Sequence, residues 1–382
     1  MKNRPVRIGI SGSYGGLNLG DEAILESIVA QLLAAMPDAE VVVFSRNTKD
    51  TEERHRIAYA IPVREITRDV AAQEIAQLDL LILGGGGILF DAEIDIYLRE
   101  VLLANELGVP VMVYAVSAGP LVKQSSRELV RAALTPAALI TVRDRQGHRL
   151  LEEVGLQREI RVTADPALLM RAQALPKDAL MREGLDMPRR RIGFSVREPG
   201  PAAPGISADH YHHLLASAAD FMVQRLDADV VFIPLERDHL DLQHSHAVVA
   251  QMQCAQRATV LKGEYSPGQI MTIIGGFEFC VGMRLHFLIF SALQGVPFVA
   301  LPYASKVTGL LQELGMDTPP MDNVNSGKLL ASIDHCWDYR ANIKSLIRER
   351  LPALQDRARE NNRLLIALLE RLRAADEAAE RG

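Results

Sequence analysis

The fold is decided by residues 280–286, CVGMRLH, and by the apolar run FLIFSAL that follows at 287–293. The pattern predicts a buried strand, a turn at Gly282 and then an apolar helix. Arg284 and His286 would lie at the helix start, where backbone N–H groups and the helix dipole favour an anion. A permanent cation near a titratable imidazole suits a phosphorylated or carboxylated substrate. A structural role also fits. Arg284 would then cap a neighbouring helix, and the imidazole of His286 would be hydrogen-bonded within the core.

Length and composition predict an ordinary globular protein of two domains. The 382 residues are 48% hydrophobic and 24% charged, and a net charge of −6 provides no basic field for nucleic acid. No apolar run reaches the roughly 18–20 residues that cross a bilayer, and the N-terminus lacks a signal-peptide core. Three scattered cysteines suit a reducing compartment. We therefore expect a cytoplasmic protein with at most peripheral membrane contact.

The first half begins with the pattern of a ligand-binding α/β unit. Residues 6–11 predict a strand, a glycine-rich loop follows, and apolar residues at helical spacing begin at Ile24. Loops at the strand ends of an open α/β sheet are where such folds bind ligands. Asn18, on this loop, is a candidate for contacting a polar ligand. Asp21 falls in the first helical turn, where both a capping and a catalytic role fit.

A second loop of this kind follows a strand that is apolar enough to be buried on both faces. The strand covers residues 79–83, and four consecutive glycines, 84–87, come after it. Such a run costs backbone entropy, which close approach to a ligand or to a neighbouring loop would offset. We interpret Gly85 and Gly86 as ligand-contacting positions. Neither loop has the Walker pattern or the dinucleotide fingerprint.

Strands and helices alternate through both halves of the chain. The alternation predicts an α/β fold with two Rossmann-like domains that face each other across a cleft. A shift in composition around residues 171–190 marks the linker. We place the domains at residues 1–175 and 190–350. A helical tail follows at 351–382, separated by a break near Pro352, and could pack back across the domain boundary.

The side chains expected at the site include cations but no evident set of metal ligands. Arg143 follows a predicted strand, as Arg284 does in the other half, and we expect it to face the cleft. The histidines do not predict a metal site, because positions i and i+2 of a helix, such as His244 and His246, point apart. His210 and His213 could share a metal, but no further ligand is evident.

Taken in order, these motifs resemble those of the polysaccharide pyruvyl transferases. They run from about residue 6 to 310 and are Asn18-Leu19-Gly20-Asp21-Glu22-Ala23-Ile24-Leu25, Gly84-Gly85-Gly86, Val142-Arg143-Asp144, Asp165-Pro166-Ala167, and Met283-Arg284-Leu285-His286 before Gly295-Val296-Pro297. Each motif alone is weak, but five in order are fairly specific. The resemblance implies a GT-B-like fold. It also implies transfer of an enolpyruvyl unit from phosphoenolpyruvate to sugar hydroxyls, which forms a cyclic pyruvate ketal.

The resemblance assigns the donor to one set of residues. It implies that Arg143, Arg284 and His286 bind the phosphate and carboxylate of phosphoenolpyruvate, and that His286 is also the acid or base. Lys306 matches the lysine of a Tyr-Asp-x-Lys pattern in which Ala304 replaces the aspartate, and the resemblance implies that Lys306 also binds the donor. No metal or other cofactor is required.

The acceptor, a sugar or a lipid-linked saccharide, would meet the first domain. The residues expected to bind it are Asn18, Asp21, Gly85 and Gly86. Tyr14 and Phe90 are the aromatic candidates for stacking on a sugar ring. The acceptor's identity, the bridged hydroxyls and the oligomeric state are left open by the sequence.

Two other functions fit parts of the pattern. A GT-B glycosyltransferase would use the same two-domain cleft for a nucleotide sugar, with Glu313 as the candidate carboxylate for the nucleotide ribose. A non-catalytic carbohydrate-binding or scaffolding protein would have no need of the cations at the strand ends, Arg143 and Arg284.

Overall fold

A computed structural model describes most of the chain. The described residues are 4–197, 207–236, 241–301, 305–316 and 325–381. They form two compact units, which we treat separately. The first unit comprises Met1–Gly16, Asp21–Leu169 and Gln355–Gly382, and the second comprises Leu17–Gly20 and Met170–Leu354.

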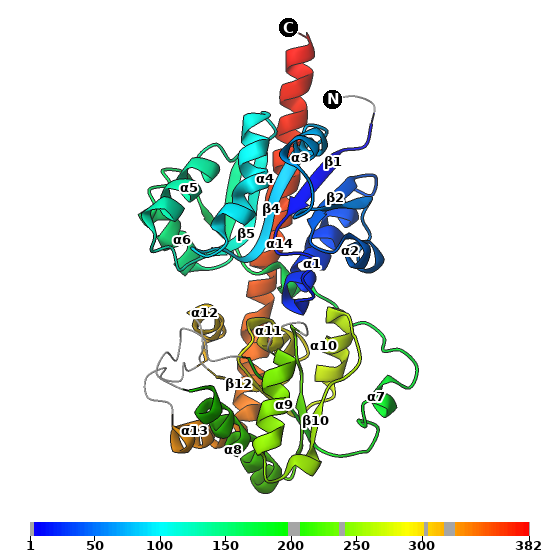
Figure 1. Ribbon diagram of the computed structural model, residues 1–382, viewed down its shortest axis with the longest axis vertical. Coiled ribbons are helices and arrows are strands. Elements are labelled where there is room, and N and C mark those ends of the chain that lie inside the picture. Colours follow the sequence, from blue (N-terminus) through cyan, green and yellow to red (C-terminus); the bar gives the residue numbers. More distant parts are fainter. Residues whose placement is uncertain (1–3, 198–206, 237–240, 302–304, 317–324, 382) are drawn as a thin grey trace. The chain divides into compact units, whose positions relative to one another are not determined.

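The first unit is built on a seven-stranded parallel sheet (Figure 1). Its strand order is β3-β2-β1-β4-β5-β6-β7, and the strands are β1 (Arg7–Ser11), β2 (Glu40–Ser45), β3 (Tyr59–Pro62), β4 (Leu80–Leu89), β5 (Val111–Ala118), β6 (Leu139–Val142) and β7 (Arg161–Val162). The helices between them are α1 (Leu19–Ala35), α2 (Thr48–Arg54), α3 (Arg68–Ile75), α4 (Ile94–Glu106), α5 (Gln124–Leu134) and α6 (Arg145–Glu153). A 3₁₀ turn, Pro166–Leu169, follows the last strand.

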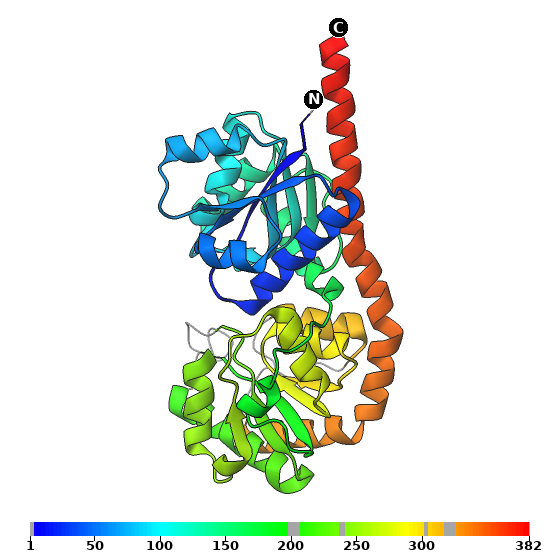
Figure 2. The same ribbon diagram turned by 90° about the vertical axis from the view of Figure 1, so that its right-hand side faces the viewer.

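The second unit repeats this plan with a five-stranded parallel sheet. Its order is β10-β9-β8-β11-β12, with β8 (Arg191–Ser195), β9 (Asp229–Phe232), β10 (Ala258–Val260), β11 (Phe279–Gly282) and β12 (Phe298–Ala300). Its helices are α7 (Ala179–Arg182), α8 (Ala208–Leu226), α9 (Asp241–Gln251), α10 (Pro267–Gly275), α11 (Leu285–Leu293), α12 (Ser305–Leu314) and α13 (Ser326–Asp338). In each unit, helices cover both faces of the sheet (Figure 2). The predicted α/β class with two parallel sheets is confirmed.

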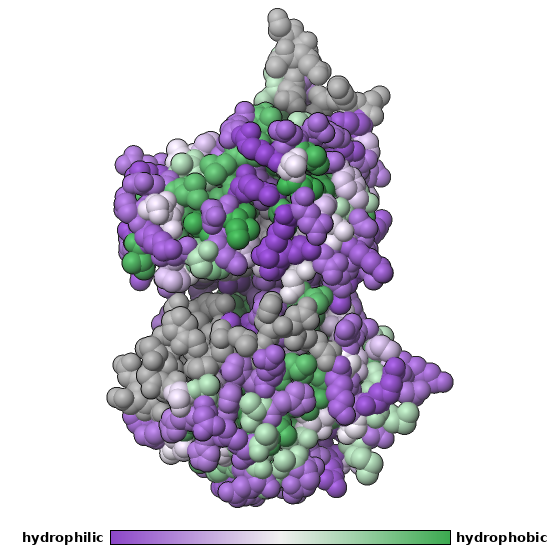
Figure 3. Space-filling view, viewed as in Figure 1, coloured by the Kyte–Doolittle hydropathy of each residue, from purple (hydrophilic) through white to green (hydrophobic). Residues whose placement is uncertain are grey.

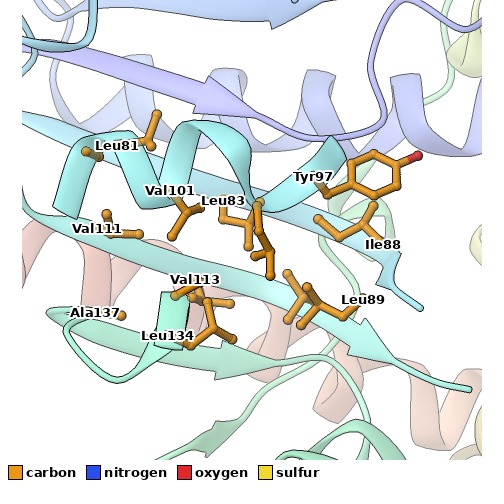
Figure 4. Packing of buried hydrophobic residues seen from close by; sticks show 14 of the residues in the cluster. Leu81, Leu83, Ile88, Leu89, Tyr97, Val101, Val111, Val113, Leu134 and Ala137 are labelled. Atoms are coloured by element: carbon orange, nitrogen blue, oxygen red, sulfur yellow. The ribbon is translucent and has the colours of Figure 1, made fainter. Parts of the chain in front are cut away.

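The core of the first unit lies between its central strands and the helices that cover them. Figure 4 shows Leu83 and Leu89 of β4 packed with Val113 of β5, Val101 of α4 and Leu134 of α5. All five are fully buried. Parallel strands buried on both faces need such continuous apolar runs, which is why their sequence signal is strong.

The glycine run belongs to strand β4, which corrects the expected strand at 79–83 followed by a loop. The strand extends to Leu89 because Gly84 and Gly86 pair with β5. A Cβ atom at Gly84 would lie 2.4 Å from the hydroxyl of Tyr14, and one at Gly85 would lie 2.3 Å from Ile24. Close packing of neighbouring side chains on the strand therefore accounts for both glycines without a ligand. Tyr14 is itself fully buried, which rules out its expected role as a sugar-stacking platform.

The C-terminal helix α14 (Arg340–Arg381) continues through Pro352, so the predicted break there is wrong. Ile347 and Leu354 are buried before and just after the proline, and Ala358 is buried one turn later. The helix keeps a buried apolar face on both sides of the proline, and this packing offsets the lost backbone hydrogen bond. Residues Gln355–Gly382 belong to the first unit.

A buried polar network attaches this helix to the first sheet. The side-chain oxygen of Asn361 accepts hydrogen bonds from Thr141 (2.7 Å) and Thr163 (2.8 Å), and its amide nitrogen donates to the carbonyl of Ala164. All three side chains are fully buried. A buried polar group is tolerated only when it is hydrogen-bonded, so the network specifies where the helix docks.

No helix among the described residues is long and apolar enough to cross a membrane. Polar residues make up most of the face that Figure 3 shows.

We predict that Asn361→Leu destabilises the first unit by about 2–4 kcal/mol, because the hydroxyls of Thr141 and Thr163 lose a partner inside the core. Urea denaturation measures the change. Asn362→Ala is the matched control, since Asn362 is only half-buried and donates one 3.3 Å hydrogen bond to the carbonyl of Gln31. Equal midpoints for the two variants would contradict the role of the network.

Candidate functional site

The predicted junction of strand and helix is present in the second unit. Strand β11 ends at Gly282, and Arg284 occupies the N-cap position of α11. A Cβ atom at Gly282 would lie 2.5 Å from the ring of Phe287, so the turn requires glycine. Burial raises the pKa of the Cys280 thiol to about 12, so this thiol is not a nucleophile near neutral pH.

Arg284 is buried and bound to two carboxylates. Its Nε atom lies 2.9 Å from Asp241 Oδ2, and its Nη2 atom lies 2.5 Å from Asp241 Oδ1 and 2.5 Å from Glu236 Oε2. Burial pulls the pKa of Arg284 down, but the two carboxylates more than offset it, so the pKa is raised. The expectation that Arg284 lies at a helix start is confirmed. Sequence reasoning missed its partners.

Asp241 is the fixed carboxylate of this cluster. It is fully buried and accepts hydrogen bonds from the backbone N–H groups of Leu235 and Glu236, both at 3.2 Å. Burial raises its pKa, although Arg284 acts in the opposite direction. Asp241 thereby ties the segment after β9 to the residue after β11.

The loop with Asn18 joins this cluster. Segment Leu17–Gly20 groups with the second unit, although the residues before and after it belong to the first. Asn18 forms an antiparallel bridge with Glu236, and the N–H of Leu19 donates to the carbonyl of Leu235 at 2.9 Å. The side-chain oxygen of Asn18 accepts from the N–H of Gly20 at 3.0 Å. The loop is therefore held by its backbone beside the two carboxylates.

His286 packs directly on this loop. A Cβ atom at Gly20 would lie 2.0 Å from Nδ1 of His286 and 2.7 Å from its Cγ atom. A glycine is required there because the imidazole occupies the space of a side chain. The structure thus brings together Asn18, Arg284 and His286, which come from two distant stretches of sequence.

Arg143 lies in the first unit, where its guanidinium forms an ion pair with a carboxylate other than those that bind Arg284. Its Nη1 atom is 2.6 Å from Asp165 Oδ2. A Cβ atom at Gly87 would lie 3.7 Å from Nη2 of Arg143, and one at Gly86 would lie 3.4 Å from Oδ1 of Asp21. The end of the glycine run is therefore bordered by a cation and a carboxylate, both predicted from sequence.

Comparison with known proteins decides the family. The family model described as polysaccharide pyruvyl transferase matches residues 18–305, which include both clusters. This chain belongs to the polysaccharide pyruvyl transferase family. The expected family membership is confirmed.

A curated relative and solved structures agree with this assignment. This chain is 21% identical to "Amylovoran biosynthesis protein AmsJ" of Erwinia amylovora, over 90% of this chain and 94% of the relative. Its fold is similar to that of the UDP-GlcNAc 2-epimerase from Neisseria meningitidis (TM-score 0.66, 9% identity, 96% of this chain and 99% of the other). It is also similar to E. coli ADP-heptose LPS heptosyltransferase II (TM-score 0.51, 16% identity, 88% and 99%). At these identities the likeness concerns the fold alone, and the predicted GT-B-like fold is confirmed.

The remaining predicted positions of this pyruvyl transferase family member are only partly described. Lys306 lies in the first turn of α12, and its side chain is outside the described residues. Residues 302–304 of the same loop also lie outside them. Asp21, Gly85 and Gly86 belong to the first unit, whereas Asn18, which was expected to act with them, groups with the second.

Two side-chain pairs that involve histidine were not predicted. Glu22 accepts from the N–H of Gly15 at 3.0 Å and bonds His55 at 2.8 Å, so it fixes the glycine-rich loop from inside. In the second unit, His212 Nε2 and His244 Nδ1 lie 2.6 Å apart. No three His, Cys, Asp or Glu side chains of the described residues form a group that could hold a metal ion.

We predict that Gly20→Ala lowers pyruvyl transfer at least about 100-fold while the protein stays folded, because the new methyl group displaces His286. Gly309→Ala is the matched control, since a Cβ atom there meets nothing within 4 Å. Initial rates and circular dichroism of both variants check the prediction. Full activity of Gly20→Ala would show that the position of His286 is unimportant.

Proposed function

We propose that this protein transfers the pyruvyl group of phosphoenolpyruvate to two hydroxyls of a sugar during polysaccharide biosynthesis, with release of phosphate and formation of a ketal. The observation that carries the proposal is that the imidazole of His286 packs against Gly20, close to the buried Arg284 at the start of α11. These residues lie within the region that the family model matches. Family membership supports pyruvyl transfer. The donor and the ketal product are our inference.

The donor's chemistry suits the second unit. Phosphoenolpyruvate is close to a trianion at neutral pH, and a guanidinium at a helix N-terminus is a preferred partner for phosphate and carboxylate. We assign donor binding to Arg284 and His286, and also to Arg143 and Lys306 on the family resemblance. The backbone of Asn18 pairs with the backbone of Glu236 beside Arg284, and this pairing supports our assignment of Asn18 to the reacting sugar hydroxyl.

The reaction needs an acid at one carbon. Protonation of the donor's methylene carbon develops oxocarbenium character at C2, a sugar hydroxyl attacks C2, phosphate leaves, and a second hydroxyl closes the ring. Histidine titrates close to neutral pH and supplies such a proton without special tuning. We propose His286 as this general acid. No metal enters the scheme.

We assign the acceptor to the first unit. Asp21 borders Gly86 in the glycine run, and these two residues, with Asn18 and with Gly85 through its backbone alone, are the proposed acceptor residues. The proposed acceptor class is a cell-surface polysaccharide or its lipid-linked saccharide precursor, which the protein would meet in the cytoplasm. The protein would then meet the membrane surface only at its substrate.

A second candidate function is glycosyl transfer from a nucleotide sugar. The observation that favours it is the shared fold, since the similar Neisseria meningitidis structure is described as "bound to UDP-GlcNAc". Fold alone carries little information on substrate, so we rank it second.

A thermal melt separates the two functions. We predict that phosphoenolpyruvate raises the melting temperature and that UDP-GlcNAc and ADP-heptose do not, because only a ligand that binds the native state stabilises it. At a ligand concentration of about 100 times Kd, the gain is about 2.7 kcal/mol. Stabilisation by a nucleotide sugar alone would favour glycosyl transfer.

Removal of the imidazole tests the chemical step. We predict that His286→Ala loses about 10²–10⁴-fold in ketal formation, as expected for a general acid. Ketal product is quantified by mass spectrometry of the saccharide. His335→Ala, a substitution at an exposed histidine of α13, serves as control and should retain full activity. A folded His286→Ala protein with unchanged rates would remove His286 from the mechanism.

A further inference from the structure

We infer that Glu236 is a second proton-transfer residue, which Arg284 holds until the anionic donor takes its place on the guanidinium. The inference rests on the proposed function. It begins with the charges of the cluster formed by Arg284, Asp241 and Glu236. One guanidinium faces two carboxylates, and Arg197 also acts on Asp241, so the charge of Arg284 is already balanced before an anionic donor arrives.

One carboxylate must therefore release its contact with Arg284 before the guanidinium can bind an anion. Asp241 cannot move easily, because it is fully buried, bonds two guanidinium nitrogens and accepts from two backbone N–H groups. Glu236 has a side chain that is 21% exposed and a single guanidinium contact, to Nη2. A donor anion that takes over the contact at Nη2 replaces the carboxylate, so the guanidinium is not left unpaired by the exchange. Glu236 is the exchangeable partner.

The backbone of Glu236 is paired with the loop on which His286 packs, and this pairing does not depend on the side chain of Glu236. Glu236 is bridged to Asn18, and two residues further along the same loop Gly20 supports the imidazole of His286. Glu236 and His286 therefore border the same three-residue segment. A carboxylate and an imidazole so placed can share the two proton transfers on the acceptor side.

Two such groups satisfy the proton balance of ketal formation. Protonated His286 gives its proton to the methylene carbon, while Glu236 takes the proton of the first hydroxyl as its oxygen bonds C2. Glu236 then returns this proton to the bridging oxygen as the bond from C2 to phosphate breaks. Neutral His286 takes the proton of the second hydroxyl as it bonds C2. Both residues regain their starting states, and phosphate leaves with one proton.

The substitution Glu236→Gln separates this role from a structural one. We predict that kcat falls about 100-fold or more, because the amide cannot accept the hydroxyl proton. Donor KM should fall several-fold, because a competing negative charge on Arg284 is gone. A purely structural carboxylate would instead give a raised KM with little change in kcat. Glu236→Asp should recover part of kcat.

Two comparisons complete the experiment. Glu278→Gln removes the same charge from a surface pair with Arg190 and should change neither constant. Asp241→Asn should weaken donor binding, because it frees Arg284 from its fixed position. If phosphoenolpyruvate fails to stabilise the unsubstituted protein, the proposed function fails. If it does stabilise the protein and Glu236→Gln retains full kcat, only the role of Glu236 is overturned.

Discussion

The second unit depends on the buried ion pair between Arg284 and Asp241. A guanidinium taken out of water must be paired and hydrogen-bonded, and loss of one partner of such a pair typically costs about 3–5 kcal/mol. Asp241 meets this demand and also binds two backbone N–H groups after β9. The pair thus joins the ends of two strands, β9 and β11, that flank β8 in the sheet. Every other member of the cluster is placed by this connection.

Two constraints of space follow from that arrangement. Segment Leu17–Gly20 adds a backbone bridge to the end of β9, and the absence of a side chain at Gly20 leaves room for His286. The glycines of β4 meet a similar demand in the first unit, where Tyr14 and Ile24 fill the positions of their missing side chains. At these positions glycine is a packing requirement.

The family and the fold contribute different kinds of information about function. Epimerases and glycosyltransferases share this GT-B-like fold, so the fold alone leaves the reaction open. The family match narrows it to pyruvyl transfer. Our proposal connects that reaction to the imidazole of His286 and the carboxylate of Glu236, residues that both border the segment Leu17–Gly20. In this view Arg284 acts through an exchange of counter-ions rather than as a free cation.

The sequence by itself determined the alternation of strands and helices, the two parallel sheets, and the positions of Arg143, Arg284 and His286 just beyond strand ends. Those features depend on local periodicity, which a linear pattern records. Only the tertiary structure decided which partners these residues have. Asp241 and Glu236 lie 43 and 48 residues from Arg284, and they reach it because β9 and β11 both flank β8. Strand order depends on packing across the whole sheet, so the identity of those carboxylates, and with it the chemistry available at Arg284, is not written in any short stretch of the chain.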